Sequence, residues 1–179
     1  PKHTFYIAGG MGNGNFLNDS PVYRTLQKEL SEAGENATLL FAGDNVSAEE
    51  DNWSNDKILL DKQIALAENF KGKLVFIPGN NEWKSYNTKK VEKIEDYIKE
   101  VEQENIHFFP ENACPIERKE INDDLLLVLV DSKWFVSNWS RVENINKKCT
   151  DIVTRRRFME ELKDAIDDNL DKNIVIAMH

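Results

Sequence analysis

Two short apolar runs, each ending beside a glycine and followed by side chains that can bind a metal, constrain this chain more than any other feature. The first run is LLFAGDN, residues 39–45, and the second is LVFIPGNNEW, residues 74–83. Runs of this length bounded by turn residues are typical of buried strands. The carboxyl ends of the strands in an open α/β sheet are where ligands bind. The pattern therefore indicates a ligand site that includes Asp44 and Asn80.

The remaining periodicity alternates between strands and helices and then changes. Apolar residues at helical spacing predict helices over residues 21–33, 56–70, 88–104 and 155–170. Apolar runs predict strands over residues 3–8, 37–42, 73–77, 106–110, 116–121, 125–130 and 173–177, with a hairpin turn at residues 122–124. This order predicts an α/β sandwich with mixed sheets flanked by helices, in a single domain over residues 1–179.

Composition excludes several classes of partner. A chain of 179 residues with 40% hydrophobic and 31% charged residues is typical of one globular domain. A net charge of -9 argues against a nucleic-acid backbone or an anionic membrane surface as the main partner. No apolar run approaches the roughly 20 residues that span a bilayer. A phosphate substrate stays compatible with this charge, because a bound metal reverses the local sign.

Cys114 and Cys149 are the only cysteines and both lie in turn-like segments. Their placement suits a disulfide in an exported protein, whereas two free thiols in a cytoplasmic protein are the alternative. The chain begins at Pro1, which is compatible with a leader that has been removed. We expect an exported, periplasmic or cell-surface location, and a cytoplasmic location stays open.

Three residues at predicted strand ends carry the chemistry. Asp44 follows a strand and a glycine, where a carboxylate can bridge hard or borderline metals; a turn or helix-capping role is the alternative. Asn80 offers a neutral amide oxygen, or else belongs to an ordinary Gly-Asn turn. His179 ends an apolar strand, so that its imidazole can reach the same edge.

With these three residues, the chain resembles the calcineurin-like metallophosphoesterases, whose second and third motifs read GDN and GNHD or GNHE. Residues 109–115 and 130–134 are similar to segments of the purple-acid-phosphatase-like bacterial branch. The resemblance implies a βαβ sandwich with an Fe, Zn or Mn pair that activates water against a phosphate ester. It also implies that Asp44 bridges the metals and that Asn80 and His179 bind the second metal. Asn45 and Trp83 are then expected on the substrate side.

The departures from the family pattern predict a degenerate site. Gly10 stands where the first motif has Asp, and Asn81 stands where the third motif has its catalytic His. An amide cannot donate a proton to a leaving group at neutral pH. The chain also stops at His179, before a final Gly-His-x-His motif, so we expect the N-terminal part of a longer fold. The inventory predicts one divalent ion (Mn, Zn, Fe or Mg) or none.

Three functions are compatible with these residues. A working phosphoesterase would act on a small phosphate ester, with Glu82 as substitute proton donor if its pKa were raised. A non-catalytic domain would keep the fold as a binding surface for a protein partner. A nucleotide site in the glycine loop, residues 9–14, is disfavoured because the spacing is not G-x-G-x-x-G and a helix does not follow at once.

Overall fold

The fold consists of seven strands and five α-helices in the part of the chain that the structure describes. A computed structural model describes residues 2–14, 20–48, 52–83, 88–101, 103–142 and 145–179. The strands are β1 (Thr4–Ala8), β2 (Ala37–Ala42), β3 (Lys73–Ile77), β4 (Ile106–Phe108), β5 (Ile116–Asn122), β6 (Leu125–Val130) and β7 (Asn173–Met178). The helices are α1 (Pro21–Glu32), α2 (Trp53–Leu66), α3 (Lys89–Glu100), α4 (Ser132–Val136) and α5 (Arg155–Asp167).

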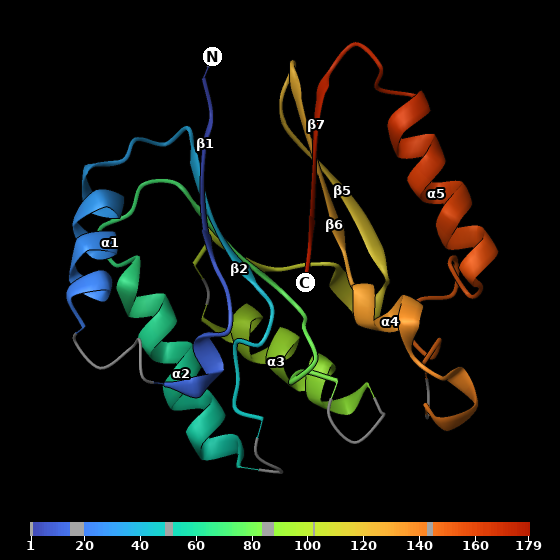
Figure 1. Cartoon of the computed structure of the whole chain (residues 1–179), viewed down its shortest axis with the longest axis horizontal. Helices are drawn as coiled ribbons and strands as arrows, with labels where there is room; N and C mark the ends of the chain where they lie inside the picture. The colour runs from blue at the N-terminus through green and yellow to red at the C-terminus, as the bar shows by residue number, and fades with distance from the viewer. Residues whose placement is uncertain (1, 15–19, 49–51, 84–87, 102, 143–144) are drawn as a thin grey trace.

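The strands form two sheets that face each other. The first sheet has four parallel strands in the order β1-β2-β3-β4, and the second has three strands in the order β5-β6-β7. Strand β5 runs antiparallel to β6, whereas β7 runs parallel to it. Helices α1 to α3 lie on the outer side of the first sheet and α5 lies on the outer side of the second (Figure 1). The predicted α/β sandwich flanked by helices is confirmed; mixed sheets were expected, and the structure has one parallel and one mixed sheet.

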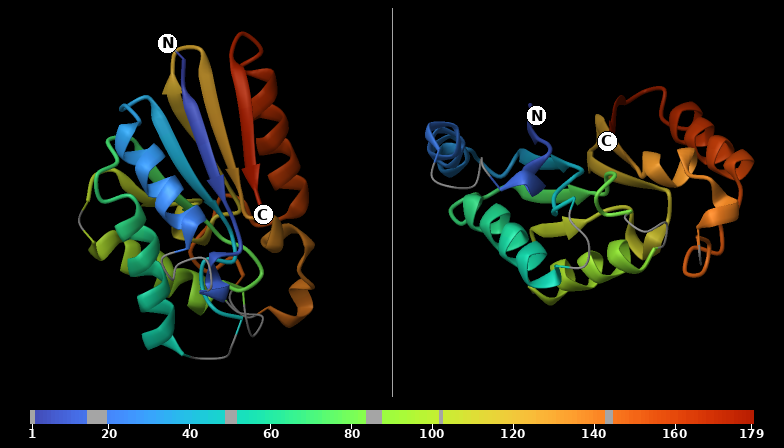
Figure 2. Two further views of the ribbon diagram at one scale, coloured as in Figure 1. Left: turned by 60° about the vertical axis from the view of Figure 1, so that its left-hand side comes forward. Right: turned by 60° about the horizontal axis from the view of Figure 1, so that its bottom comes forward.

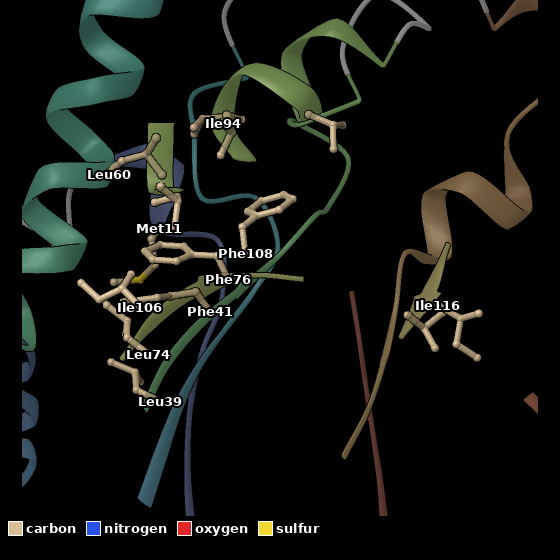
Figure 3. Close-up of a cluster of buried hydrophobic side chains, with 14 of the residues drawn as sticks. Met11, Leu39, Phe41, Leu60, Leu74, Phe76, Ile94, Ile106, Phe108 and Ile116 are labelled. Atoms are coloured by element: carbon tan, nitrogen blue, oxygen red, sulfur yellow. The ribbon is translucent and has the colours of Figure 1, made fainter. Parts of the chain in front are cut away.

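Burial of alternate faces holds the layers together. Phe41 and Phe76 stack with ring centroids 4.7 Å apart beneath the helices, within the cluster that Figure 3 shows. A second cluster fills the space between the two sheets and includes Leu40, Val75 and Leu127. The two clusters explain why β2 and β3 are apolar without alternation, since both of their faces are covered. Figure 2 shows the same layering from two other sides.

Helix boundaries differ from the periodicity where capping decides them. Helix α2 begins at Trp53, earlier than residue 56, because the Asn52 side chain accepts a hydrogen bond from the Asn55 N–H. The helix ends at Leu66, before residue 70. Helix α4 was not predicted; Asp131 caps it by accepting from the Trp134 N–H.

Cys114 and Cys149 form a disulfide, which confirms the pairing and excludes two free thiols. The bond joins the segment before β5 to the loop that precedes α5. Among the described residues, no helix is long and apolar enough to cross a bilayer.

Candidate functional site at the carboxyl edge of the first sheet

The turn after β2 places Asp44 in a rare backbone conformation. Gly43 has φ 83° and Asp44 has φ 55°, so both lie in the left-handed region. Glycine is required at position 43, because an added Cβ would lie 2.6 Å from the His179 Nδ1 atom and 2.8 Å from the Gly79 Cα atom. For a residue with a side chain such as Asp44, this conformation is uncommon and is concentrated at functional positions.

His179 crosses from the second sheet to meet this turn. Its Nδ1 atom lies 2.9 Å from the Ala42 carbonyl oxygen, and its own carbonyl accepts a hydrogen bond from the Ser132 hydroxyl at 2.9 Å. Because a carbonyl can only accept, Nδ1 carries the ring proton in the neutral imidazole. The Nε2 atom is then an acceptor, and it lies 3.7 Å from the Asp44 Oδ2 atom.

The turn after β3 meets the same carboxylate. The Asn81 N–H donates to the Asp44 Oδ1 atom at 2.9 Å, and the Asn81 side-chain amide donates to the Val46 carbonyl at 2.9 Å. The Asn81 side chain is thus held against the neighbouring loop. Asn80 is exposed and follows Gly79 directly. The structure therefore brings together the turns that carry Asp44 and Asn80, together with His179.

Glu82 lies beneath the two turns and is fully buried. Its carboxylate accepts three backbone N–H groups, from Gly79 at 2.6 Å, from Asn45 at 2.6 Å and from Asp44 at 3.1 Å. Burial raises the pKa of Glu82, and the charge of Asp44 adds to this, while the backbone donors oppose it. The direction of this shift is the one that a proton donor needs, but both carboxylate oxygens are occupied by N–H groups below the surface.

Two residues expected on the substrate side are buried. Asn45 is 0% exposed and donates through its amide to the Ile77 carbonyl at 2.9 Å. Trp83 is 3% exposed and its indole N–H donates to the Asp131 Oδ2 atom at 2.7 Å. Neither side chain is open to solvent in this structure. A contact of either one with a substrate stays a prediction.

Asp131 was missing from the predicted site residues. It lies 3% exposed at the end of β6, and burial raises its pKa to about 7, with the charge of Glu82 adding to the shift. Hydrogen bonds from Trp134 and Trp83 oppose the shift. The signal was present, because Asp131 follows an apolar run as Asp44 does. Its hydrogen-bond partner Trp83 could not be predicted, because the two residues are 48 positions apart in the chain.

The loop after β1 confirms that the glycine-rich segment does not lead directly into an α-helix. Residues Met11–Asn13 form one turn of 3-10 helix, whereas α1 begins only at Pro21. Gly10 has φ 68° and its N–H donates to the Gly43 carbonyl at 3.1 Å, so this loop adjoins the Asp44 turn. A Cβ atom built on Gly10 would have no atom within 4 Å. Position 10 therefore faces open space beside the candidate site.

In the part of the chain that the structure describes, the acidic and imidazole groups at this edge do not form a full metal shell. Within the described ranges, no group of three or more His, Cys, Asp or Glu side chains is placed to hold a metal ion. Asp44 and His179 are the two such residues that meet at the edge. Among the described residues, the groups left to serve as a third ligand are amides and backbone carbonyls.

A family model for calcineurin-like phosphoesterases matches residues 18–179. The chain belongs to the calcineurin-like phosphoesterase family. No curated protein and no solved structure shows significant similarity to it. Members of this family typically bind divalent metals, and the family suggests phosphoester substrates.

Proposed function

We propose that this domain is a phosphoesterase of weakened activity that holds one divalent ion through Asp44 and His179, with Asn80 as a third ligand. The observation that supports the proposal is the pair formed by Asp44 Oδ2 and His179 Nε2. These two acceptor atoms face each other at 3.7 Å, and the ring proton is engaged on the other side by a backbone carbonyl. A carboxylate oxygen and an imidazole nitrogen that face each other are held together either by a second ring proton or by a bound cation.

The residues fit a small divalent ion. Two ligands at about 2.1 Å from a tetrahedral metal lie roughly 3.4 Å apart, which is close to the separation of the Asp44 and His179 atoms. A metal-bound His usually donates its second N–H to a carbonyl or carboxylate, as His179 does to the Ala42 carbonyl. Mixed carboxylate, imidazole and amide ligands suit Mn²⁺, Zn²⁺, Fe²⁺ or Mg²⁺.

The residues around the ion define what the domain can and cannot do. A bound divalent ion supplies Lewis-acid polarisation of a phosphate ester and a more acidic water. Asn81 donates hydrogen bonds but no proton, and its side-chain amide is engaged by the Val46 carbonyl. Glu82 is too deeply buried to reach a leaving group. We therefore expect slow turnover, best with esters whose leaving group needs no proton.

Gly10 and Asn81 support a second candidate, a non-catalytic domain that binds a phosphorylated ligand or a protein partner. Both positions lack the side chains that the family uses for chemistry, while the core is intact. A variant that restores the missing side chains at positions 10 and 81 can separate the two candidate functions. Position 10 has space for a Cβ atom but a positive φ, which Asp tolerates better than most residues. The Gly10→Asp, Asn81→His variant therefore restores the missing groups at some cost in backbone strain at position 10.

The first test is the binding of Mn²⁺ to the full chain, measured by electron paramagnetic resonance and by calorimetry. We expect about one equivalent, lost in Asp44→Ala and in His179→Ala, with slow hydrolysis of an aryl phosphate. Binding unchanged in both variants would overturn the assignment of the ligands. The non-catalytic candidate is favoured by one combination of results: the unmodified chain binds Mn²⁺ but does not hydrolyse the aryl phosphate, and the Gly10→Asp, Asn81→His variant does hydrolyse it.

The disulfide between Cys114 and Cys149 supports an exported location, which we propose together with a single-domain organisation. A small phosphate ester is the substrate class that the family suggests.

A further inference from the structure

Glu82 uses both of its carboxylate oxygens on the backbone of the two turns that carry Asp44 and Asn80. The Oε2 atom accepts from the Gly79 N–H at 2.6 Å and from the Asp44 N–H at 3.1 Å, while Oε1 accepts from the Asn45 N–H at 2.6 Å. One side chain therefore satisfies backbone donors from the ends of two neighbouring strands.

These contacts join turns that are already in backbone contact. A Cβ atom on Gly79 would lie 2.5 Å from the Asp44 nitrogen, and one on Gly43 would lie 2.8 Å from the Gly79 Cα atom. Such close approach leaves no room for a side chain or for water between the turns. All three N–H groups have Glu82 as their partner, and without it the buried N–H groups of Asn45 and Gly79 would lose theirs.

We propose that Glu82 is a positioning residue, which fixes the Asp44 carboxylate by joining the two turns from below. Asp44 is held in a left-handed conformation that costs free energy for a residue with a side chain. Its N–H is engaged by Glu82, and its Oδ1 atom by the Asn81 N–H at 2.9 Å. With both ends of the residue fixed, Oδ2 is the oxygen left to face His179. This inference rests on the proposed metal site for its functional meaning.

The next residue extends the support to the second sheet. The Trp83 indole N–H donates to Asp131 at 2.7 Å, and the adjacent Ser132 hydroxyl donates to the His179 carbonyl at 2.9 Å. Glu82 thus holds the turn that carries Asp44, while Trp83 contacts Asp131, which is adjacent to the serine that binds the His179 carbonyl.

Glu82→Gln is the variant that tests the role with little change in size. An amide nitrogen cannot accept, so in either orientation Gln places its NH₂ group against at least one backbone N–H. Glu95→Gln is the matched control, because Glu95 is 1% exposed and accepts the Asn112 N–H at 2.7 Å, far along the chain from the site. Glu82→Asp keeps both oxygens on a shorter side chain and serves as the conservative variant.

Two measurements on the full chain decide the matter. Amide hydrogen exchange followed by NMR reports the protection of residues 44, 45 and 79 without any metal, and calorimetry reports the affinity for Mn²⁺. We expect Glu82→Gln to speed exchange at these three amides and to weaken Mn²⁺ binding by about 10- to 100-fold. Glu95→Gln is expected to change neither, and Glu82→Asp to retain part of both.

The outcomes are separable. Unchanged protection at the three amides, or unchanged Mn²⁺ affinity alongside lost protection, would overturn the role of Glu82. An equal loss of affinity in Glu95→Gln would assign the effect to global stability and would likewise overturn it. If the unmodified chain binds no Mn²⁺, the proposed function fails, and the exchange data alone then decide whether Glu82 fixes the turn. Should Glu82→Gln not fold, the same comparison is made with Glu82→Asp.

Discussion

Replacing Asp131 by Asn should change how the stability of this domain depends on pH. Asp131 is buried, and its pKa rises from 3.8 to about 7 on folding, chiefly because burial disfavours the charged form. The folded state therefore holds the proton more tightly than the unfolded chain does. The stabilisation is complete below the unfolded pKa and is lost as the pH rises through the folded pKa.

The size of the effect follows from the shift. A rise of about three pKa units corresponds to about 4 kcal/mol over the whole window. Solubility falls near the sequence pI of about 4.9, so a practical range begins at about pH 5.5. Between about pH 5.5 and about pH 8, the free energy of unfolding should fall by about 2 kcal/mol through this carboxyl alone. Asn cannot titrate, so the variant loses this decline.

The hydrogen bonds of Asp131 determine how far the free energy of unfolding of Asp131→Asn lies below that of the unmodified protein at low pH. Its two oxygens accept from Trp83 and from Trp134, and an amide can accept through one atom only. Asp131→Asn should thus cost about 1–3 kcal/mol at low pH, and this deficit should shrink towards pH 8. Trp83→Phe should show the opposite dependence on pH. It removes a donor that favours the charged form of Asp131, so its loss of stability should grow towards pH 8.

Urea unfolding in the presence of a chelator, followed by far-UV circular dichroism at several pH values, measures these differences. The decisive quantity is the change of the variant-minus-parent free energy of unfolding with pH. A difference that stays constant from about pH 5.5 to about pH 8 would refute the argument that Asp131 is protonated on folding.

Three further predictions concern other parts of the fold. Gly43→Ala should destabilise the domain by more than about 1–2 kcal/mol, since φ is 83° and the new Cβ would lie 2.6 Å from the His179 ring; thermal unfolding and loss of Mn²⁺ binding would report it. Phe41→Ala should cost about 3–5 kcal/mol in urea unfolding, because Phe41 is fully buried. Replacement of Cys114 and Cys149 by Ser opens a loop with a sequence separation of 35 residues and should cost about 4 kcal/mol in the chain-entropy model; an unchanged melting temperature would contradict this.

The central strands β2 and β3 could be predicted because they are apolar on both faces and are followed closely by glycines. Strands β2 and β3 were predicted at the bounds that the structure has, and the hairpin of β5 and β6 is confirmed. Helix ends were less accurate, since the Asn52 cap sets the start of α2 through a side-chain hydrogen bond that apolar periodicity does not register. Helix α4 has five residues, which is too short for a periodic signal.

The candidate site could be predicted in part for a similar reason. Strand ends place Asp44 and His179 at one edge, and the structure brings them within 3.7 Å. The role of Glu82 could not be predicted, because it depends on hydrogen bonds to the backbone of a turn 37 residues away in the chain. The burial of Asn45 and Trp83 likewise depends on tertiary packing, which the motif that suggested a substrate-binding role for them does not describe.

The strand order has a consequence for how the domain folds. Each sheet adds its strands in the order of the chain, β1 to β4 and then β5 to β7. Each new strand therefore pairs with its predecessor over a shorter stretch of chain than the 137 residues that separate His179 from the Ala42 carbonyl. Closing the longest loop costs the most chain entropy and comes after the local pairings. We expect the amides of β2 and β3 to become protected before the His179 imidazole contacts the Ala42 carbonyl, so the site would be among the last parts of the domain to form.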